Sequence, residues 1–274
     1  MTIGLVHPGE MGAAVGAALR IGGRTVLWAS EGRSAATVGR AQQAGLEDVG
    51  TVEELARRCD VIVSLCPPHA AVDVARSLPG FAGVYVDANA ISPATARTLA
   101  SLVGRYVDGG VIGPPPRGPG TTRLYLSGPE AVSVAGSFED TIVDARIVSS
   151  DPTAASALKM TYAAWTKGTA ALLLAVRAVA RAESVEQALL DEWSMSLPEL
   201  PARSAAAARS ALGKGWRWVG EMDEIAETFA AAGLPDGFHR AAAEIYRRSP
   251  HEAADGDAGL EVVLSALRSN AALT

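Results

Sequence analysis

The first sixteen residues combine a short apolar run, a glycine-rich turn and a helix of small residues. The apolar run covers Ile3–Val6, glycines follow at positions 9 and 12, and alanines occupy positions 13, 14, 17 and 18. A strand, a glycine-rich turn and a helix in this order cradle a dinucleotide pyrophosphate, because glycine lets the backbone approach the phosphates and the helix N-terminus offers N–H groups. His7 stands where the G-x-G-x-x-G pattern has its first glycine. We predict a dinucleotide site made by His7, Pro8, Gly9, Glu10, Met11 and Gly12.

Apolar runs recur along the first half of the chain and alternate with helical patterns. The expected strands are Ile3–Val6, Thr25–Trp28, Val61–Leu65, Val84–Asp87, Tyr106–Ile112 and Leu124–Ser127. The expected helices between them are Ser34–Ala44, Val52–Arg58, Ala70–Ser77 and Pro93–Val103. Nearly continuous apolar strands that alternate with helices predict a mainly parallel, doubly wound sheet covered on both faces. The fold class is therefore α/β, with an N-terminal Rossmann-type NAD(P)-binding domain in residues 1–150.

The character of the sequence changes near residue 150. Asp151 and Pro152 suit the N-cap and the first position of a helix. The rest of the chain has an almost wholly helical pattern, with breaks expected near Ser196–Pro201, Gly213–Gly215 and Gly233–Gly237. We predict that a long helix leads into an all-helical substrate and dimerisation domain in residues 151–274.

Composition excludes several classes of protein. The 24 basic and 30 acidic residues give a net charge of −6 without a basic run, which argues against nucleic acid as a partner. No apolar stretch of membrane-spanning length and no leader pattern occur, so we expect no membrane partner and a cytoplasmic protein. The two cysteines flank one expected strand and are poorly placed to bridge, and the four histidines are scattered, so we expect no disulfide and no metal site.

Three further segments carry a family resemblance. Residues 86–93, VDANAISP, resemble the D-x-S-T-I-S-P segment of β-hydroxyacid dehydrogenases. Residues 106–114, YVDGGVIGP, resemble their D-A-P-V-S-G-G substrate segment, and residues 158–165, LKMTYAAW, resemble their K-x-x-x-N catalytic helix. With the N-terminal turn and the LCPP sequence at 65–68, the matches follow the family's order. The chain resembles the 6-phosphogluconate dehydrogenase/β-hydroxyacid dehydrogenase superfamily, in a divergent, mostly uncharacterised subgroup that is related to imine reductases.

The resemblance implies that Lys159 is the catalytic proton carrier. Ala163 replaces the family's asparagine and cannot form a side-chain hydrogen bond. Tyr162 and Thr166 share a helix face with Lys159, so we expect Tyr162 to hold the substrate oxygen and Thr166 to contact the substrate. Without the resemblance, this polar stripe is equally compatible with a solvent-exposed helix edge.

The substrate segment departs from the family pattern. Ile112, Gly113 and Pro114 replace the Ser-Gly-Gly whose amides hold a carboxylate, and proline has no N–H to donate. Arg117 is a candidate anion clamp in their place, or else a loop arginine in water. Asn89 replaces a serine beside the nicotinamide and substrate, and Cys66 and Pro67 are expected to contact the cofactor. His239 stands where relatives have a Lys-Asp pair that lines the cleft, although a single helical histidine is often a surface residue.

Cofactor preference is set at the end of the second strand. An NAD enzyme usually presents a carboxylate there to the ribose, whereas an NADP enzyme has small or basic residues for the 2′-phosphate. Ala29 follows the strand, Ser30, Arg33 and Ser34 can hold a phosphate, and Glu31 argues the other way. We expect NADPH to be preferred over NADH.

These features together predict an NADP-preferring oxidoreductase. It would transfer hydride between the nicotinamide and the carbonyl or hydroxyl carbon of a small anionic substrate, with Lys159, Tyr162 and Asn89 as catalytic residues. One alternative is an imine reductase, although such relatives typically have Asp or Tyr in place of the lysine. Another is a non-catalytic NADPH-binding sensor or scaffold, which the loss of the asparagine and the loop amides keeps open.

The helical half also predicts a homodimer. Its first helix carries apolar residues on many sides, Leu172, Leu173, Leu174, Val176 and Val179, and the later helices are expected to be short. Such a chain offers few bulky side chains for a separate core. Relatives pair through this domain, so we expect a two-fold dimer in which His239 or Arg240 of one chain approaches Lys159 of the other.

Overall fold

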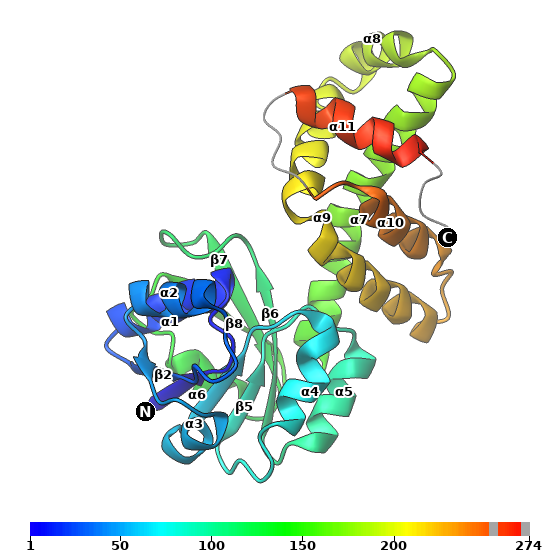
Figure 1. Cartoon of the computed structure of the whole chain (residues 1–274). Coiled ribbons are helices and arrows are strands. Elements are labelled where there is room, and N and C mark those ends of the chain that lie inside the picture. Colours follow the sequence, from blue (N-terminus) through cyan, green and yellow to red (C-terminus); the bar gives the residue numbers. More distant parts are fainter. Residues whose placement is uncertain (252–256, 270–274) are drawn as a thin grey trace. The chain divides into compact units, whose positions relative to one another are not determined.

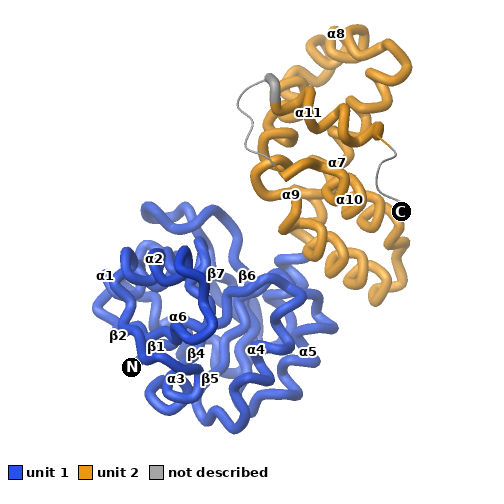
Figure 2. The backbone as a smooth tube through the Cα atoms, in the orientation of Figure 1, with its two compact units in different colours: residues 1–160 blue, residues 161–274 orange. Residues whose placement is uncertain are grey.

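The computed structural model describes residues 1–251 and 257–269 and divides into two compact units. Unit 1 comprises residues 1–160 and unit 2 comprises residues 161–274 (Figure 2). The boundary falls inside helix α7 (Ala154–Ala182), somewhat beyond the expected domain limit at residue 150.

Unit 1 is built on one sheet of eight strands in the order β3-β2-β1-β4-β5-β6-β7-β8. The strands are β1 (Thr2–Leu5), β2 (Thr25–Trp28), β3 (Glu47–Asp48), β4 (Val61–Ser64), β5 (Val84–Asp87), β6 (Tyr106–Ile112), β7 (Thr122–Ser127) and β8 (Val143–Ser149). All neighbouring pairs are parallel except β6 and β7, which are antiparallel. The predicted α/β class with a mainly parallel sheet is confirmed.

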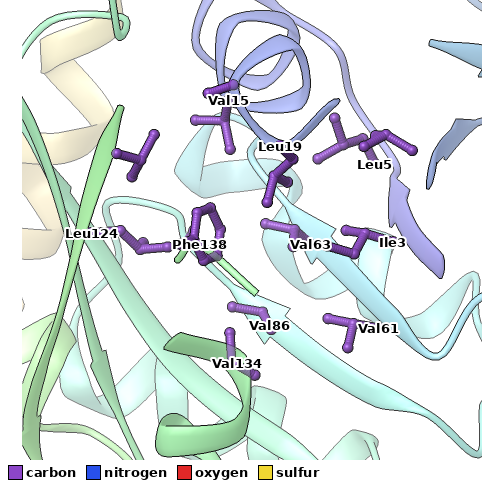
Figure 3. Packing of buried hydrophobic residues seen from close by; sticks show 14 of the residues in the cluster. Ile3, Leu5, Val15, Leu19, Val61, Val63, Val86, Leu124, Val134 and Phe138 are labelled. Carbon is purple, nitrogen blue, oxygen red and sulfur yellow. The ribbon is translucent and has the colours of Figure 1, made fainter. Parts of the chain in front are cut away.

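Helices cover both faces of this sheet (Figure 1). They are α1 (Glu10–Ile21), α2 (Ala35–Gln43), α3 (Val52–Arg58), the 3₁₀ turn η1 (Pro68–Ala70), α4 (Ala71–Arg76), α5 (Pro93–Leu102) and α6 (Ala131–Gly136). Side chains alternate between the faces along each strand, so Val61 and Val63 pack with α1 and α6, while Ile62 packs with α3, α4 and α5. Figure 3 shows the hydrophobic core on the α1 and α6 side of the sheet, with Leu19 of α1 near Val63 and Val134 of α6 near Val86.

The sequence patterns missed two strands and misplaced one helix start. β3 and most of β8 are exposed, and β3 has only two residues, so neither carries the apolar run that marks a buried strand. The long helix begins at Ala154 rather than at Pro152, so that expectation was wrong. The Asp151 carboxylate accepts hydrogen bonds from the N–H and hydroxyl of Thr153 in a turn that precedes the helix.

Unit 2 is helical in its described part. The later half of α7 is followed by α8 (Glu186–Ser196), α9 (Leu200–Ala231), α10 (Gly237–Arg248) and α11 (Asp257–Arg268). The break expected at Gly213–Gly215 is wrong, because α9 runs unbroken for 32 residues. A Cβ atom at Gly215 would be 3.5 Å from the ring of Tyr246 on α10. Close packing of this kind compensates the roughly 1 kcal/mol that a helical glycine costs. The premise that the later helices are short was therefore also wrong.

A buried arginine joins three helices of unit 2. Arg177 of α7 donates to the Glu186 carboxylate of α8 at 2.6 and 3.0 Å and to the hydroxyl of Ser204 of α9 at 2.8 Å. Its residue is only 5% exposed, and a buried guanidinium needs such acceptors to offset its lost hydration. Among the described residues, no helix is both long enough and apolar enough to cross a membrane.

Candidate active site

The glycine-rich turn between β1 and α1 forms an open backbone surface. A Cβ atom at Gly12 would lie 2.4 Å from the carbonyl oxygen of His7, so only glycine fits there. A Cβ atom at Gly9 would meet nothing within 4 Å in the described chain, and Gly9 caps α1 without a side-chain acceptor. The helix N-terminus therefore borders open space with no carboxylate or hydroxyl cap at that position. This arrangement fits a dinucleotide phosphate.

The loop after β2 returns to this turn through Arg33. The Arg33 N–H donates to the carbonyl of Ser30 at 3.0 Å and so closes a four-residue β-turn. Gly32, the third residue of this turn, has a φ of +69°, a backbone conformation that favours glycine. An Nη atom of Arg33 then lies 2.5 Å from Nε2 of His7. Burial, followed by the charge of Arg33, lowers the pKa of His7 to about 4. Ser34 uses its hydroxyl to cap α2, accepting the Thr37 N–H at 3.3 Å.

A second arginine, which the sequence patterns did not indicate, reaches the same turn. Arg40 of α2 donates to the carbonyl of Pro8 at 3.5 Å and to the hydroxyl of Thr37 at 3.0 Å. One sequence feature could have indicated it, because Arg40 is the only basic residue of α2, the helix that follows the loop after β2. Two guanidinium groups therefore contact residues 7 and 8, Arg33 through the His7 side chain and Arg40 through the Pro8 carbonyl.

The carboxyl ends of β4 and β5 are joined by the Asn89 side chain. Its amide nitrogen donates to the Asp87 carboxylate at 2.6 Å and to the Ser64 hydroxyl at 3.2 Å, and its oxygen accepts the Cys66 N–H at 2.5 Å. Asn89 is 3% exposed. Both of its amide protons are thus already donated, and the side chain fixes the segment that begins at Cys66 and Pro67. Burial raises the pKa of the Cys66 thiol to about 11, so this thiol is neutral at physiological pH. Cys66 and Cys59 are both free thiols, not joined by a disulfide.

Lys159 sits where the start of α7 docks on β6. The Asp108 carboxylate accepts the N–H of Ser156 at 2.7 Å, its hydroxyl at 2.5 Å and the Ser127 hydroxyl at 3.2 Å. A Cβ atom at Gly110 would be 3.0 Å from the Cβ atom of Lys159. Burial raises the pKa of Asp108 to about 6 in spite of these donors. Gly110 and Lys159, which come from two of the segments that resemble the family motifs, therefore pack against each other within unit 1.

The loop between β6 and β7 follows Ile112 and contains Gly113 and Arg117, three residues that the sequence indicated for substrate binding. Gly113 has a φ of +122°, and a Cβ atom there would be 2.2 Å from the carbonyl of Thr121. The Ile112 side chain is buried, whereas Arg117 is exposed. The Thr122 hydroxyl closes the loop by donating to the carbonyl of Pro114 at 2.6 Å.

The remaining candidates belong to unit 2. Tyr162 and Thr166 are exposed on α7, and the Thr166 hydroxyl donates to the Tyr162 carbonyl at 3.2 Å. His239 of α10 is 5% exposed and packs against the rings of Phe229 and Phe238, with centroids 4.2 and 5.2 Å away. Its burial lowers its pKa. The ring of His239 is thus enclosed within the helical unit, while Tyr162 and Thr166 face solvent.

Unit 2 also contains a groove of about 330 Å³ between α7 and α9. Thr166, Lys167 and Thr169 line it from α7, and Arg203, Ser210 and Trp218 line it from α9. Lys167 forms an ion pair with the buried carboxylate of Glu221. In the described ranges, no three histidine, cysteine or acidic side chains lie close enough together to hold a metal ion.

Comparison with known proteins shows which families and solved structures this chain resembles. A domain of unknown function (DUF1932) matches residues 180–249, and no curated protein matched by sequence. A conserved hypothetical protein of Sinorhizobium meliloti 1021 superposes with a TM-score of 0.70 at 27% identity, covering 97% of this chain and 96% of that one. The 3-hydroxyisobutyrate dehydrogenase of Mycobacterium tuberculosis, solved with L-serine, gives 0.69 at 19% identity, covering 98% and 99%. An imine reductase of Myxococcus stipitatus, in complex with NADP+, gives 0.58 at 20% identity, covering 90% and 93%.

The structural neighbours thus include 3-hydroxyacid dehydrogenases and imine reductases. The chain has the fold of the β-hydroxyacid dehydrogenase-like family, an α/β part with a mainly parallel sheet followed by a helical part, as the sequence motifs indicated.

Proposed function

We propose that this protein is an NADP-preferring oxidoreductase that transfers hydride between the nicotinamide and the carbonyl or hydroxyl carbon of a small anionic substrate. One arrangement at the carboxyl ends of β1 and β2 carries the proposal. The glycine-rich turn after β1 is open, and the Arg33 guanidinium lies beside it in contact with His7. Residue 29, at the end of β2, is an alanine and therefore presents no carboxylate there. Open parallel sheets bind nucleotides at this edge. The shared fold with dehydrogenases and imine reductases supports the same conclusion.

The cofactor roles follow from these positions. The backbone of residues 7–12 would hold the pyrophosphate, and Ser30, Arg33 and Ser34 would surround the 2′-phosphate. Arg33 suits this role because a guanidinium binds phosphate oxygens through several N–H groups at once. The dinucleotide supplies or accepts the hydride when it is bound. Asn89 holds the Cys66–Pro67 segment that would face the nicotinamide, and this is the role we assign to it.

Lys159 would give a proton to the substrate oxygen during reduction and take it back during oxidation. Its ammonium group is a compact donor on a flexible stem, which suits proton transfer at a developing alkoxide. Tyr162, one helical turn further along α7, would hold the same oxygen. Arg117, together with the backbone of Ile112 and Gly113, would bind the substrate's anionic group, and the exposed Thr166 would contact the substrate from unit 2.

Imine reduction is the second candidate, because NADP+-bound imine reductases share the fold. Lys159 favours the carbonyl reaction, since a protonated amine is a poor partner for a cationic iminium substrate.

We also propose that the protein is a homodimer joined through its helical unit. Large apolar side chains are exposed there in the isolated chain, among them Trp165, Val179, Met195, Trp216 and Phe238, at 49 to 75% exposure. Packing against a second copy of the chain would remove such side chains from water.

The deciding experiment has two stages. NADPH and NADH are first titrated by calorimetry, and the purified protein is then assayed with NADPH against short 2- and 3-oxo acids and cyclic imines. Tight NADPH binding with turnover of an oxo acid supports the proposal. Turnover of imines alone favours the second candidate, binding without any turnover favours a sensor or scaffold, and absence of binding refutes all three.

A further inference from the structure

His7 and Arg33 form a contact that local sequence patterns do not anticipate. The two residues come from different loops, one after β1 and one after β2, and their side chains meet at 2.5 Å. Every N–H of a guanidinium is a donor, so Nε2 of His7 must accept. The imidazole is therefore neutral in this pair, with its proton on Nδ1.

Two buried donors next to this contact lack an acceptor. Nδ1 of His7 and Nε of Arg33 are both buried, and neither makes a hydrogen bond to any residue that the structure describes. Buried donors are almost always paired in folded proteins, by protein, water or ligand. Two such donors beside an open helix N-terminus indicate a site for a ligand rich in acceptor oxygens, as a phosphate is.

The backbone does not explain why a histidine stands at the first glycine position of the motif. Among the described residues with positive φ, the only ones other than glycine are Asp140 and Ser184, so His7 has an ordinary backbone conformation. The close approach in this turn involves Gly12, whose Cβ position lies 2.4 Å from the His7 carbonyl. The side chain of His7 is therefore available for a separate task.

We propose that His7 is a positioning residue that holds Arg33 in place for the 2′-phosphate of NADPH, and so contributes to the preference over NADH. This inference rests on the proposed function and deepens it. An arginine on a surface loop loses side-chain freedom when it binds a phosphate, and a partner that already restrains it lowers that cost. Restraint of one long side chain corresponds to about a three- to tenfold change in affinity.

The test compares variants by calorimetric titration with NADPH and NADH. His7→Gly restores the glycine of the motif and removes the acceptor, whereas His7→Gln retains a side-chain acceptor at a similar reach. Arg33→Ala and the double variant complete a thermodynamic cycle. Thermal unfolding of each variant verifies that it is folded, and 2′,5′-ADP and 5′-AMP serve as fragment probes that differ in the 2′-phosphate.

We expect His7→Gly to weaken NADPH and 2′,5′-ADP by about three- to tenfold and to leave NADH and 5′-AMP unchanged. We expect His7→Gln to retain most of the wild-type affinity, and His7→Gly to have no further effect once Arg33 is alanine. Equal loss for both cofactors, no loss, or the same loss in the Arg33→Ala background would overturn the role of His7. If instead the wild-type protein prefers NADH, the proposed cofactor preference itself fails, and with it this inference.

Discussion

The Cβ atom of Lys159 on α7 packs directly over Gly110 of β6, where a Cβ atom would come within 3.0 Å of it. The same added atom would lie 3.0 Å from the carbonyl oxygen of Ala155. The candidate proton carrier is thus positioned by the absence of a side chain on the neighbouring strand, and by the Asp108 carboxylate that holds the start of the helix at Ser156.

Substitution of Gly110 by alanine should disturb this contact. The added methyl group must displace backbone as well as a side chain, so we expect a loss of about 1–3 kcal/mol of stability, together with reduced turnover. Urea unfolding and steady-state kinetics measure the two effects. Gly39→Ala on α2, where a Cβ atom meets nothing within 4 Å, is the matched control and should be neutral or slightly stabilising. Equal behaviour of the two variants would contradict the packing argument.

Lys159→Ala should remove the proton carrier. We expect turnover to fall by about 10²-fold or more, with NADPH affinity nearly unchanged, because general acid–base catalysis commonly contributes a factor of this size. Lys214→Ala, at an exposed lysine of α9, should leave both quantities unaffected. Surviving activity in Lys159→Ala would assign proton transfer to Tyr162 or to water.

Arg33→Ala should erase most of the cofactor preference. In the wild-type protein we expect NADPH to bind at least tenfold more tightly than NADH, a difference of about 1.4 kcal/mol. Without the guanidinium the two affinities should converge, as titration of both cofactors will measure. Arg76→Ala on α4, at an exposed arginine, removes the same charge without this effect. Equal or tighter binding of NADH by the wild type would refute the assignment.

The stability of the protein should depend on pH through His7. In the fold its pKa is lowered to about 4 from 6.5, so between these values the unfolded chain binds the extra proton. The contribution of neutral His7 is therefore complete above pH 6.5 and declines as the pH falls toward 4. Asp108, whose raised pKa of about 6 acts in the opposite direction, is common to wild type and His7→Gln and cancels in their difference.

We therefore expect the unfolding free energy of the wild type minus that of His7→Gln to be largest above pH 6.5 and to shrink toward pH 4. Urea titrations between pH 4.5 and 7.5 measure this difference. A difference that stays constant across this range would show that His7 is not held in its neutral form by the fold.

Light scattering should give twice the chain mass of 28.1 kDa at micromolar concentration. Val179→Asp places a charge on an exposed apolar position of α7 and should shift the protein toward monomer, because an unpaired charge in an apolar interface is costly. Ile21→Asp, at a more exposed apolar position of unit 1, is the control and should not change the mass. A wild-type mass of one chain would exclude the dimer.

Local patterns in the sequence were sufficient for the alternation of strands and helices in unit 1. The bounds of β2, β5, β6 and α3 agree with those expected, because buried strands are short apolar runs and Thr51 caps α3. The glycine-rich turn was equally readable, since the steric need for Gly12 is local. Short-range chemistry of this kind determined the fold class and the edge of the sheet at which we propose that the cofactor binds.

Only the tertiary structure decided how distant residues combine. The continuity of α9 through Gly213 and Gly215 depends on packing that overrides local propensity, and the edge strands β3 and β8 form because neighbouring strands offer hydrogen bonds. The pairing of His7 with Arg33, and the inward-facing hydrogen bonds of Asn89, follow from side chains that separate loops bring together. A sequence specifies what each of these groups can donate or accept, but their partners are chosen by the folded backbone.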